Sequence, residues 1–135
     1  DTHASTPSGL DGPGGPGAST PHDLAAIFRA AMANPVFAEI TAQPAATFPT
    51  DAGERPIVNM NELLARYPGA FGGKTGFTDA ARKTYVGGAA RDGRRLVVAM
   101  MYGLIHEGGP TYWDQAAALL DWGFAQGPMS SVGSL

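Results

Sequence analysis

The chain has no cysteine among its 135 residues. Without thiols it can form neither a disulfide framework nor a cysteine-ligated metal site. The absence of cysteine does not indicate whether the protein works in an oxidising or a reducing compartment. No apolar run approaches the length of a membrane-spanning helix, and no signal peptide opens the chain. Nine Lys and Arg residues against twelve Asp and Glu give a formal charge of −3 without a basic run, which argues against a nucleic-acid partner.

Hydrophobic residues make up 44% of the chain and charged residues 16%, which is typical of a globular protein and sufficient for one domain with a modest core. The first residues, Asp1-Thr2-His3, do not resemble a translation start. We therefore expect a processed or excised piece of a longer protein. Residues 1–19 are rich in Ser, Thr, Gly and Pro, and by themselves indicate a loop or linker.

Local patterns predict helices first, then antiparallel strands, then a closing helix. Thr20 is a suitable N-cap, Pro21 fits a first helical turn, and Asp23 suits the positive end of the helix dipole. That helix carries a predicted core stripe of Leu24, Ile27, Phe28, Ala31 and Met32, and Asn34-Pro35 ends it. The further expected elements are a short helix over 36–40, a strand at 47–48, a polar turn over 50–55, a helix over 59–67, a strand over 70–77, strands over 84–90 and 96–102, and a helix over 112–124. The order predicts an α+β fold with an antiparallel sheet flanked by helices.

Asp92-Gly93 lies between two apolar runs and is a strong hairpin signal. We interpret the flanking arginines, Arg91, Arg94 and Arg95, as a solvated surface. In the predicted helix over 59–67, the inward-facing residues are Met60, Leu63 and Leu64. In the closing helix, the residues at helical spacing are Trp113, Ala116, Ala117, Leu120 and Phe124, and Trp122 lies in the same helix. Both tryptophans are therefore expected in the core.

The most informative stretch is Gly72-Gly73-Lys74-Thr75-Gly76-Phe77-Thr78. Its glycines let a ligand approach the backbone, and its lysine and threonines supply a charge and hydroxyl groups for a carboxylate or phosphate. A phosphate loop needs a glycine at position 68, where Pro68 stands, and a helix after the motif, which the sequence does not indicate. The alternative is the Lys-Thr-Gly element of serine acyltransferases that react with β-lactams, in which the triplet lies on an exposed strand beside a cleft.

Several separated segments resemble, in order, the second half of the catalytic domain of D-alanyl-D-alanine carboxypeptidases, the low-molecular-mass penicillin-binding serine peptidases. The resemblance spans roughly residues 2–125. It rests on residues 7–11, 20–25, 59–64, 71–81, 89–98 and 119–124. It implies the β-lactamase and penicillin-binding transpeptidase fold, with residues 1–127 as the second portion of a catalytic domain and 128–135 as a tail.

The resemblance implies a D-Ala-D-Ala carboxypeptidase that cleaves peptidoglycan stem peptides through an acyl-serine intermediate and that β-lactams inhibit. Its expected partners are the stem peptide, β-lactams and the first half of the same domain, in an extracytoplasmic and membrane-associated setting. No metal or organic cofactor is implied. The alternative from another class is a non-catalytic wall-binding or scaffolding module of the same fold.

Family catalysis needs a Ser-x-x-Lys and a Ser-x-Asn element, and none of the six serines of this chain begins either one. The resemblance would place both upstream of Asp1. Within the chain it assigns positive charge beside the nucleophile to Lys74 and one oxyanion-hole N–H to Phe77. Substrate binding falls to Thr75, Gly76 and Thr78, the first by a bond to the substrate carboxylate.

Other polar residues carry weaker expectations. The family often places a carboxylate-binding arginine before the last helix, where this sequence has Gly109-Pro110-Thr111. Asp79 is expected to cap the turn after the Lys-Thr-Gly strand. His3, His22 and His106 are too widely spaced to indicate a metal site.

Overall fold

The structure, a computed structural model, describes residues 1–103 and 107–127. The expected tail over 128–135 and His106 lie outside the described residues. The helices are α1 (Pro21–Ala31), α2 (Pro35–Ala42), α3 (Leu63–Arg66) and α4 (Tyr112–Ala125), and the strands are β1 (Ala45–Thr50), β2 (Gly53–Val58), β3 (Ala70–Thr78), β4 (Arg82–Arg91) and β5 (Arg94–Met100). In the described part of the chain no helix has the length and apolar character needed to cross a membrane.

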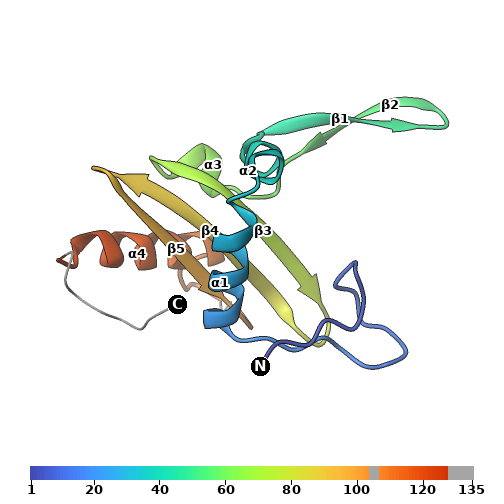
Figure 1. The fold of residues 1–135 in the computed structure, drawn as a ribbon, viewed down its shortest axis with the longest axis horizontal. Helices are drawn as coiled ribbons and strands as arrows, with labels where there is room; N and C mark the ends of the chain where they lie inside the picture. Colours follow the sequence, from blue (N-terminus) through green and yellow to red (C-terminus); the bar gives the residue numbers. More distant parts are fainter. Residues whose placement is uncertain (104–106, 128–135) are drawn as a thin grey trace.

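The centre of the molecule is a three-stranded antiparallel sheet in the order β3-β4-β5. Helices α1 and α4 both contact β4 and β5, and they lie on opposite faces of the sheet (Figure 1). This arrangement confirms the α+β fold with an antiparallel sheet flanked by helices. It also leaves β3 at the edge, with a strand neighbour on one side only.

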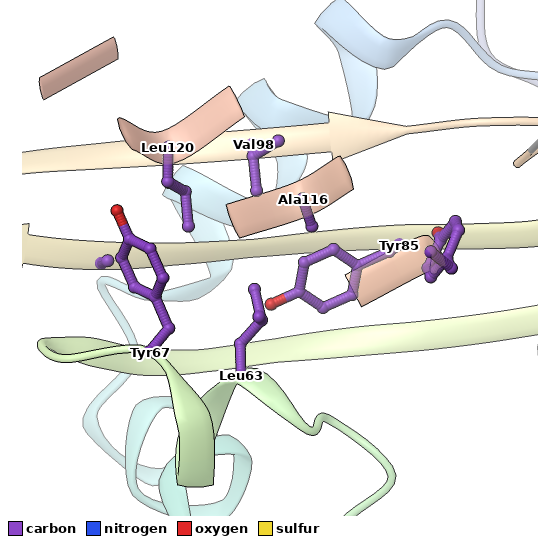
Figure 2. Packing of buried hydrophobic residues seen from close by; sticks show 8 residues of the cluster. Leu63, Tyr67, Tyr85, Val98, Ala116 and Leu120 are labelled. Atoms are coloured by element: carbon purple, nitrogen blue, oxygen red, sulfur yellow. The ribbon is translucent and has the colours of Figure 1, made fainter. Parts of the chain in front are cut away.

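The main core lies between the sheet, α3 and α4 (Figure 2). Helix α4 buries Tyr112, Ala116 and Leu120, which are four positions apart and so share one helical face. Thr111 and Asp114 form a reciprocal capping box at its start. The remaining buried members of this core are Leu63, Tyr67, Tyr85, Ala89 and Val98.

Helix α1 begins as predicted, because the Thr20 hydroxyl accepts the N–H of Asp23 at 3.0 Å and Pro21 occupies the first turn. The predicted core stripe is wrong at Ile27, whose residue is 52% exposed. Phe28 of the stripe is buried as predicted, and Ala25, which the stripe did not include, is the other buried residue of the helix. Helix α2 follows with Asn34 as its N-cap and is longer than the predicted 36–40.

Strands β1 and β2 form a separate hairpin that projects from the end of α2 (Figure 1). The predicted strand at 47–48 is confirmed, but the polar turn over 50–55 is wrong, because β2 starts at Gly53. Every residue of both strands is exposed, so neither strand carries the alternating burial that periodicity detects.

The predicted helix over 59–67 shrinks to the single turn of α3. Asn59 and Asn61 accept the backbone N–H groups of Asn61 and Leu63 with their own side chains, at 2.9 and 3.2 Å. These local bonds replace helical ones. Met60 therefore does not face inward and is 75% exposed, whereas Leu63 is buried.

The expectation of a solvated arginine surface at the β4–β5 turn is wrong for Arg91 and Arg94, which are half-buried, whereas Arg95 is exposed as expected. Arg91 lies over the rings of Phe124 and Tyr67, and Arg95 lies 4.0 Å from the ring centroid of Phe71. Arg94 donates to three carbonyl oxygens at the end of α4. These contacts join residues 24 to 33 positions apart, so no local pattern could indicate them.

The two tryptophans of α4 differ. Trp113 packs against the core, with its ring centroid 5.2 Å from that of Tyr85. Trp122 is 52% exposed, so its predicted core position is wrong. It lies next to Asp121 and away from the face that carries Leu120.

Candidate active site

The stretch from Gly72 to Thr78 lies within the edge strand β3. It is followed by a turn and by strand β4 rather than by a helix. This order excludes the phosphate-loop interpretation, which needs a helix N-terminus behind the glycines. Because β3 pairs only with β4, alternate N–H and C=O groups along its other side have no strand partner within the described chain.

A groove of about 790 Å³ runs beside this strand. Lys83 and Thr84 of the neighbouring strand β4 also line this groove. Its wall consists of Thr6, Pro7, Ser8, Gly9, Leu10, Met60, Glu62, Lys74, Thr75, Gly76, Phe77, Thr78, Ala81, Lys83, Thr84, Tyr112 and Trp113. All five predicted site residues are therefore in one groove.

Lys74 is exposed, and its ammonium donates to the carbonyl oxygen of Thr75. Within residues 1–103 and 107–127 no carboxylate forms an ion pair with it. Glu62, the acidic residue of the groove wall, is paired with Arg66 at 3.3 Å. The charge of Lys74 is consequently available to an anionic ligand.

Thr75 stands opposite Tyr85 in the β3–β4 register, and Gly76 stands opposite Thr84. A Cβ on Gly76 would lie 2.6 Å from the Thr84 hydroxyl oxygen. Only glycine therefore leaves both this hydroxyl and the strand backbone accessible to a ligand. Thr75 is half-buried and lies between Lys74 and Gly76 in the strand, and all three residues line the groove. A carboxylate at this place could meet an ammonium and hydroxyl groups at once.

The end of the strand is shaped by its turn. The Thr78 hydroxyl accepts the N–H of Ala81 at 3.0 Å, so Thr78 caps the turn that Asp79 was expected to cap. Asp79 itself is exposed. Phe77 is 57% exposed, with the Arg82 guanidinium 5.9 Å from its ring centroid.

The comparisons with known proteins agree with this geometry. The sequence profile of the D-alanyl-D-alanine carboxypeptidase family, peptidase family S11, matches residues 1–103. The chain belongs to this family. It is 77% identical over 134 residues to the D-alanyl-D-alanine carboxypeptidase DacB2 of Mycobacterium tuberculosis, covering 99% of this chain and 46% of that protein.

Two solved structures extend the likeness to the fold of this carboxypeptidase-family chain. A crystal structure of a D-alanyl-D-alanine carboxypeptidase from M. tuberculosis has a TM-score of 0.94 at 77% identity, covering 99% of this chain and 51% of that one. The Streptomyces K15 DD-transpeptidase has a TM-score of 0.67 at 30% identity, covering 80% and 42% respectively. The chain thus has part of the penicillin-binding transpeptidase fold and spans about half the length of these relatives.

Sequence reasoning about the carboxypeptidase-family motifs missed much of the groove wall. Trp113, expected in the core, also lines the groove together with Tyr112, and Lys83 and Thr84 enter it from β4. Their positions follow from the pairing of β4 with β3 and the packing of α4, which are long-range contacts. Pairing the predicted strands over 70–77 and 84–90 would have been the available signal for Thr84, which stands opposite Gly76.

Residues 1–19 do not behave as a plain linker. His3 and Ala18 exchange two backbone hydrogen bonds, at 2.8 and 2.9 Å, and Gly12 bridges to Gly15. The loop so closed places Thr6 to Leu10 on the groove wall. Leu10 is 62% exposed there and is not a core residue.

No cluster of three or more His, Asp or Glu side chains suited to a metal ion occurs in the described ranges. His3 and His22 lie there, whereas His106 falls outside them. The groove wall itself offers the ammonium groups of Lys74 and Lys83, the Glu62 carboxylate, hydroxyls and backbone groups.

Proposed function

We propose that the protein containing this chain is a serine-type D-Ala-D-Ala carboxypeptidase that removes the terminal D-alanine from peptidoglycan stem peptides. The observation that carries this proposal is the Lys-Thr-Gly triplet on an open edge strand beside the 790 Å³ groove. Family membership of the chain supports it. β-Lactams, which acylate the same serine, are the proposed inhibitors.

The proposed reaction has two steps. A serine hydroxyl from the remainder of the protein attacks the carbonyl carbon before the terminal D-alanine, and the C–N bond breaks while the departing amine takes up a proton. Water then attacks the resulting ester and restores the serine. In this scheme the Phe77 N–H stabilises the oxyanion, a contribution worth about 3 kcal/mol for one such donor.

Substrate binding is assigned to the residues next to that N–H. The stem peptide would lie along the open side of β3, with its terminal carboxylate held by the Thr75 hydroxyl and the Lys74 charge. Gly76 leaves room for the peptide backbone, and Thr78 supports the end of the strand through its bond to Ala81. The family's carboxylate-binding arginine is missing from the segment directly before α4, which reads Gly109-Pro110-Thr111. Lys83 is the additional cation in the groove wall that could bind the same carboxylate.

The proposed setting is the cell envelope, outside the cytoplasmic membrane and associated with it, because the substrate is peptidoglycan. The first half of the same catalytic domain would supply the serine. We propose no nucleic-acid partner and no cofactor.

The test uses the full-length protein that contains this chain. We expect a fluorescent penicillin to label one serine covalently, and a pentapeptide ending in D-Ala-D-Ala to release free D-alanine. A protein that binds peptidoglycan but is neither labelled nor releases D-alanine would overturn the proposal in favour of the scaffolding alternative.

A further inference from the structure

One buried polar side chain next to the Lys-Thr-Gly strand is not used by the proposed chemistry. Asn61 is 2% exposed and lies in the segment between β2 and α3. Its Oδ1 accepts two hydrogen bonds, from the Leu63 N–H at 3.2 Å and from the Tyr85 hydroxyl at 3.1 Å. Since a backbone N–H can only donate, the atom that faces it must be the amide oxygen, and this fixes the orientation of the side chain.

The other end of this amide lies against β3. A Cβ on Gly73 would be 2.9 Å from Asn61 Nδ2 and 2.9 Å from the Tyr85 hydroxyl oxygen. Two polar atoms therefore rest on the backbone of the residue that immediately precedes Lys74. Asn61 Nδ2 has no hydrogen-bond partner among the described residues, which is a costly state for a buried donor.

The Tyr85 hydroxyl is a dependable donor in this arrangement. Burial raises the pKa of Tyr85 to about 12, so the phenol keeps its proton at neutral pH. Figure 2 shows its hydroxyl end directed toward Leu63 of α3, on the same side as the Asn61 segment. Tyr85 also stands directly opposite Thr75 in the sheet, so its position and that of the threonine are linked.

The chain of bonds continues to α2. Asn59 accepts the Asn61 N–H at 2.9 Å and donates from Nδ2 to the carbonyl oxygens of Thr41 and Gln43, at 3.2 and 2.9 Å. The end of α2, the segment before α3, and strand β4 are thus tied together around Gly73. Within residues 1–103 and 107–127 the open side of β3 has no strand to hold it in place.

From this geometry we infer that Asn61 is a positioning residue: through Tyr85 and its contact with Gly73 it fixes β3 so that Lys74, Thr75 and the Phe77 N–H keep their arrangement along the groove. The inference rests on the proposed function for its catalytic consequence. Its structural consequence, a β3 strand held in one position, does not depend on that function.

The informative substitution is Tyr85→Phe, which removes one hydroxyl and keeps the ring. Its matched control is Tyr67→Phe, because Tyr67 is also buried and its hydroxyl donates to Asp121 at 2.7 Å, away from the groove. Both variants are made in the full-length protein, together with Asn61→Ala and the double variant Asn61→Ala/Tyr85→Phe.

Hydrogen–deuterium exchange of residues 70–78 gives a readout that does not need activity. We expect about tenfold faster exchange in this segment for Tyr85→Phe and Asn61→Ala, and no change for Tyr67→Phe. Because Asn61 and Tyr85 act through one bond, the double variant should exchange no faster than Asn61→Ala alone. Unchanged exchange in Tyr85→Phe, or equal acceleration in Tyr67→Phe, overturns the inference.

Acylation by a fluorescent penicillin gives the second readout. The acylation rate constant should fall about tenfold in Tyr85→Phe while the preceding non-covalent affinity changes less, and Tyr67→Phe should keep the unsubstituted rate. Faster exchange of β3 with an unchanged acylation rate would overturn the catalytic part of the inference. An unsubstituted protein that is not acylated at all refutes the proposed function instead, and the exchange result then still decides whether Asn61 holds the strand.

Discussion

At the scale of single residues, Lys74 carries the clearest prediction. Lys74→Ala removes the unpaired ammonium beside the groove, which in the proposed mechanism stabilises both the nucleophile's anionic character and the bound carboxylate. We expect penicillin acylation of the full-length protein to slow by on the order of a hundredfold, equivalent to about 3 kcal/mol of transition-state stabilisation. Stopped-flow acylation kinetics measure this directly, and an unchanged rate would remove β3 from the catalytic cleft.

Thr75 tests the carboxylate assignment separately. Thr75→Val keeps the shape of the side chain and removes its hydroxyl, so it should weaken peptides with a free terminal carboxylate more than amidated analogues. The comparison is the ratio of kcat/KM for the two peptide forms in the variant and in the unsubstituted protein. The same ratio in both proteins would mean that the Thr75 hydroxyl does not bind the carboxylate.

Arg94 carries a prediction about stability. Its guanidinium donates to the carbonyl oxygens of Phe124 and Gln126, both at 2.9 Å, and of Gly123 at 3.2 Å. These bonds satisfy carbonyls at the negative end of the α4 dipole. Arg94→Met keeps the alkyl stem and should lower the free energy of unfolding by about 1–3 kcal/mol, measured by urea denaturation.

The control for Arg94→Met is Arg29→Met, at an exposed position in the last turn of α1. It should change the same quantity by less than about 0.5 kcal/mol. Equal denaturation midpoints for the two variants would mean that Arg94 belongs, after all, to a solvated surface.

At the scale of elements, the start of α4 makes stability depend on pH. The Asp114 carboxylate accepts from the hydroxyl and N–H of Thr111 and pairs with Arg66, and these contacts lower its pKa below the ordinary value. A group whose pKa is lowered by folding stabilises the fold above its unfolded pKa of about 4, and this contribution disappears as the pH falls through the folded pKa.

Asp114→Asn should therefore lower the unfolding free energy at neutral pH and lose this effect in acid. We expect the difference between the variant and the unsubstituted protein to be constant above about pH 5 and to shrink as the pH falls below about 4, in urea titrations at each pH. Glu39→Gln, at an exposed position of α2, is the control. A difference that does not shrink in acid would show that the charge of Asp114 contributes nothing.

The contrast between elements also explains which of them could be predicted. Helix α4 and the β4–β5 hairpin were found because each carries its own local signal, apolar residues at helical spacing and an Asp-Gly turn. Strand β2 was missed because both of its faces are exposed, so its sequence shows no alternation of apolar and polar residues. Within the described residues its strand partner is β1 alone. Helix α3 was overextended because Asn59 and Asn61 use their side chains where a helix would use its backbone.

At the scale of the whole molecule, residues 1–19 can be tested as a groove wall. The backbone bonds between His3 and Ala18 bring the ends of the loop together, so residues 5–16 can be replaced by Gly-Gly without stretching the chain. In the full-length protein this change removes Thr6 to Leu10 from the groove. We expect weaker non-covalent binding of penicillin before acylation, and a Tm lower by a few degrees, about 2–4 °C per kcal/mol lost.

If residues 1–19 are only a linker, this replacement should change neither penicillin binding nor Tm. Binding, measured from the concentration dependence of acylation, and Tm, measured by calorimetry, would then both match those of the unsubstituted protein. The closed loop and its place in the groove wall favour the first outcome.

The sequence by itself determined what depends on near neighbours: the Thr20 and Asn34 caps, the hairpin turn, the strand that carries Lys74 to Thr78, and the family whose motif this is. Only the tertiary structure decided which faces of those elements are covered, how Arg91 and Arg94 are used, and which residues from five separate segments meet in the groove. The physical reason is the range of the forces. Caps, turns and propensities act within a few residues, whereas the Asn61–Tyr85 bond joins residues 24 positions apart and exists only once the chain has folded.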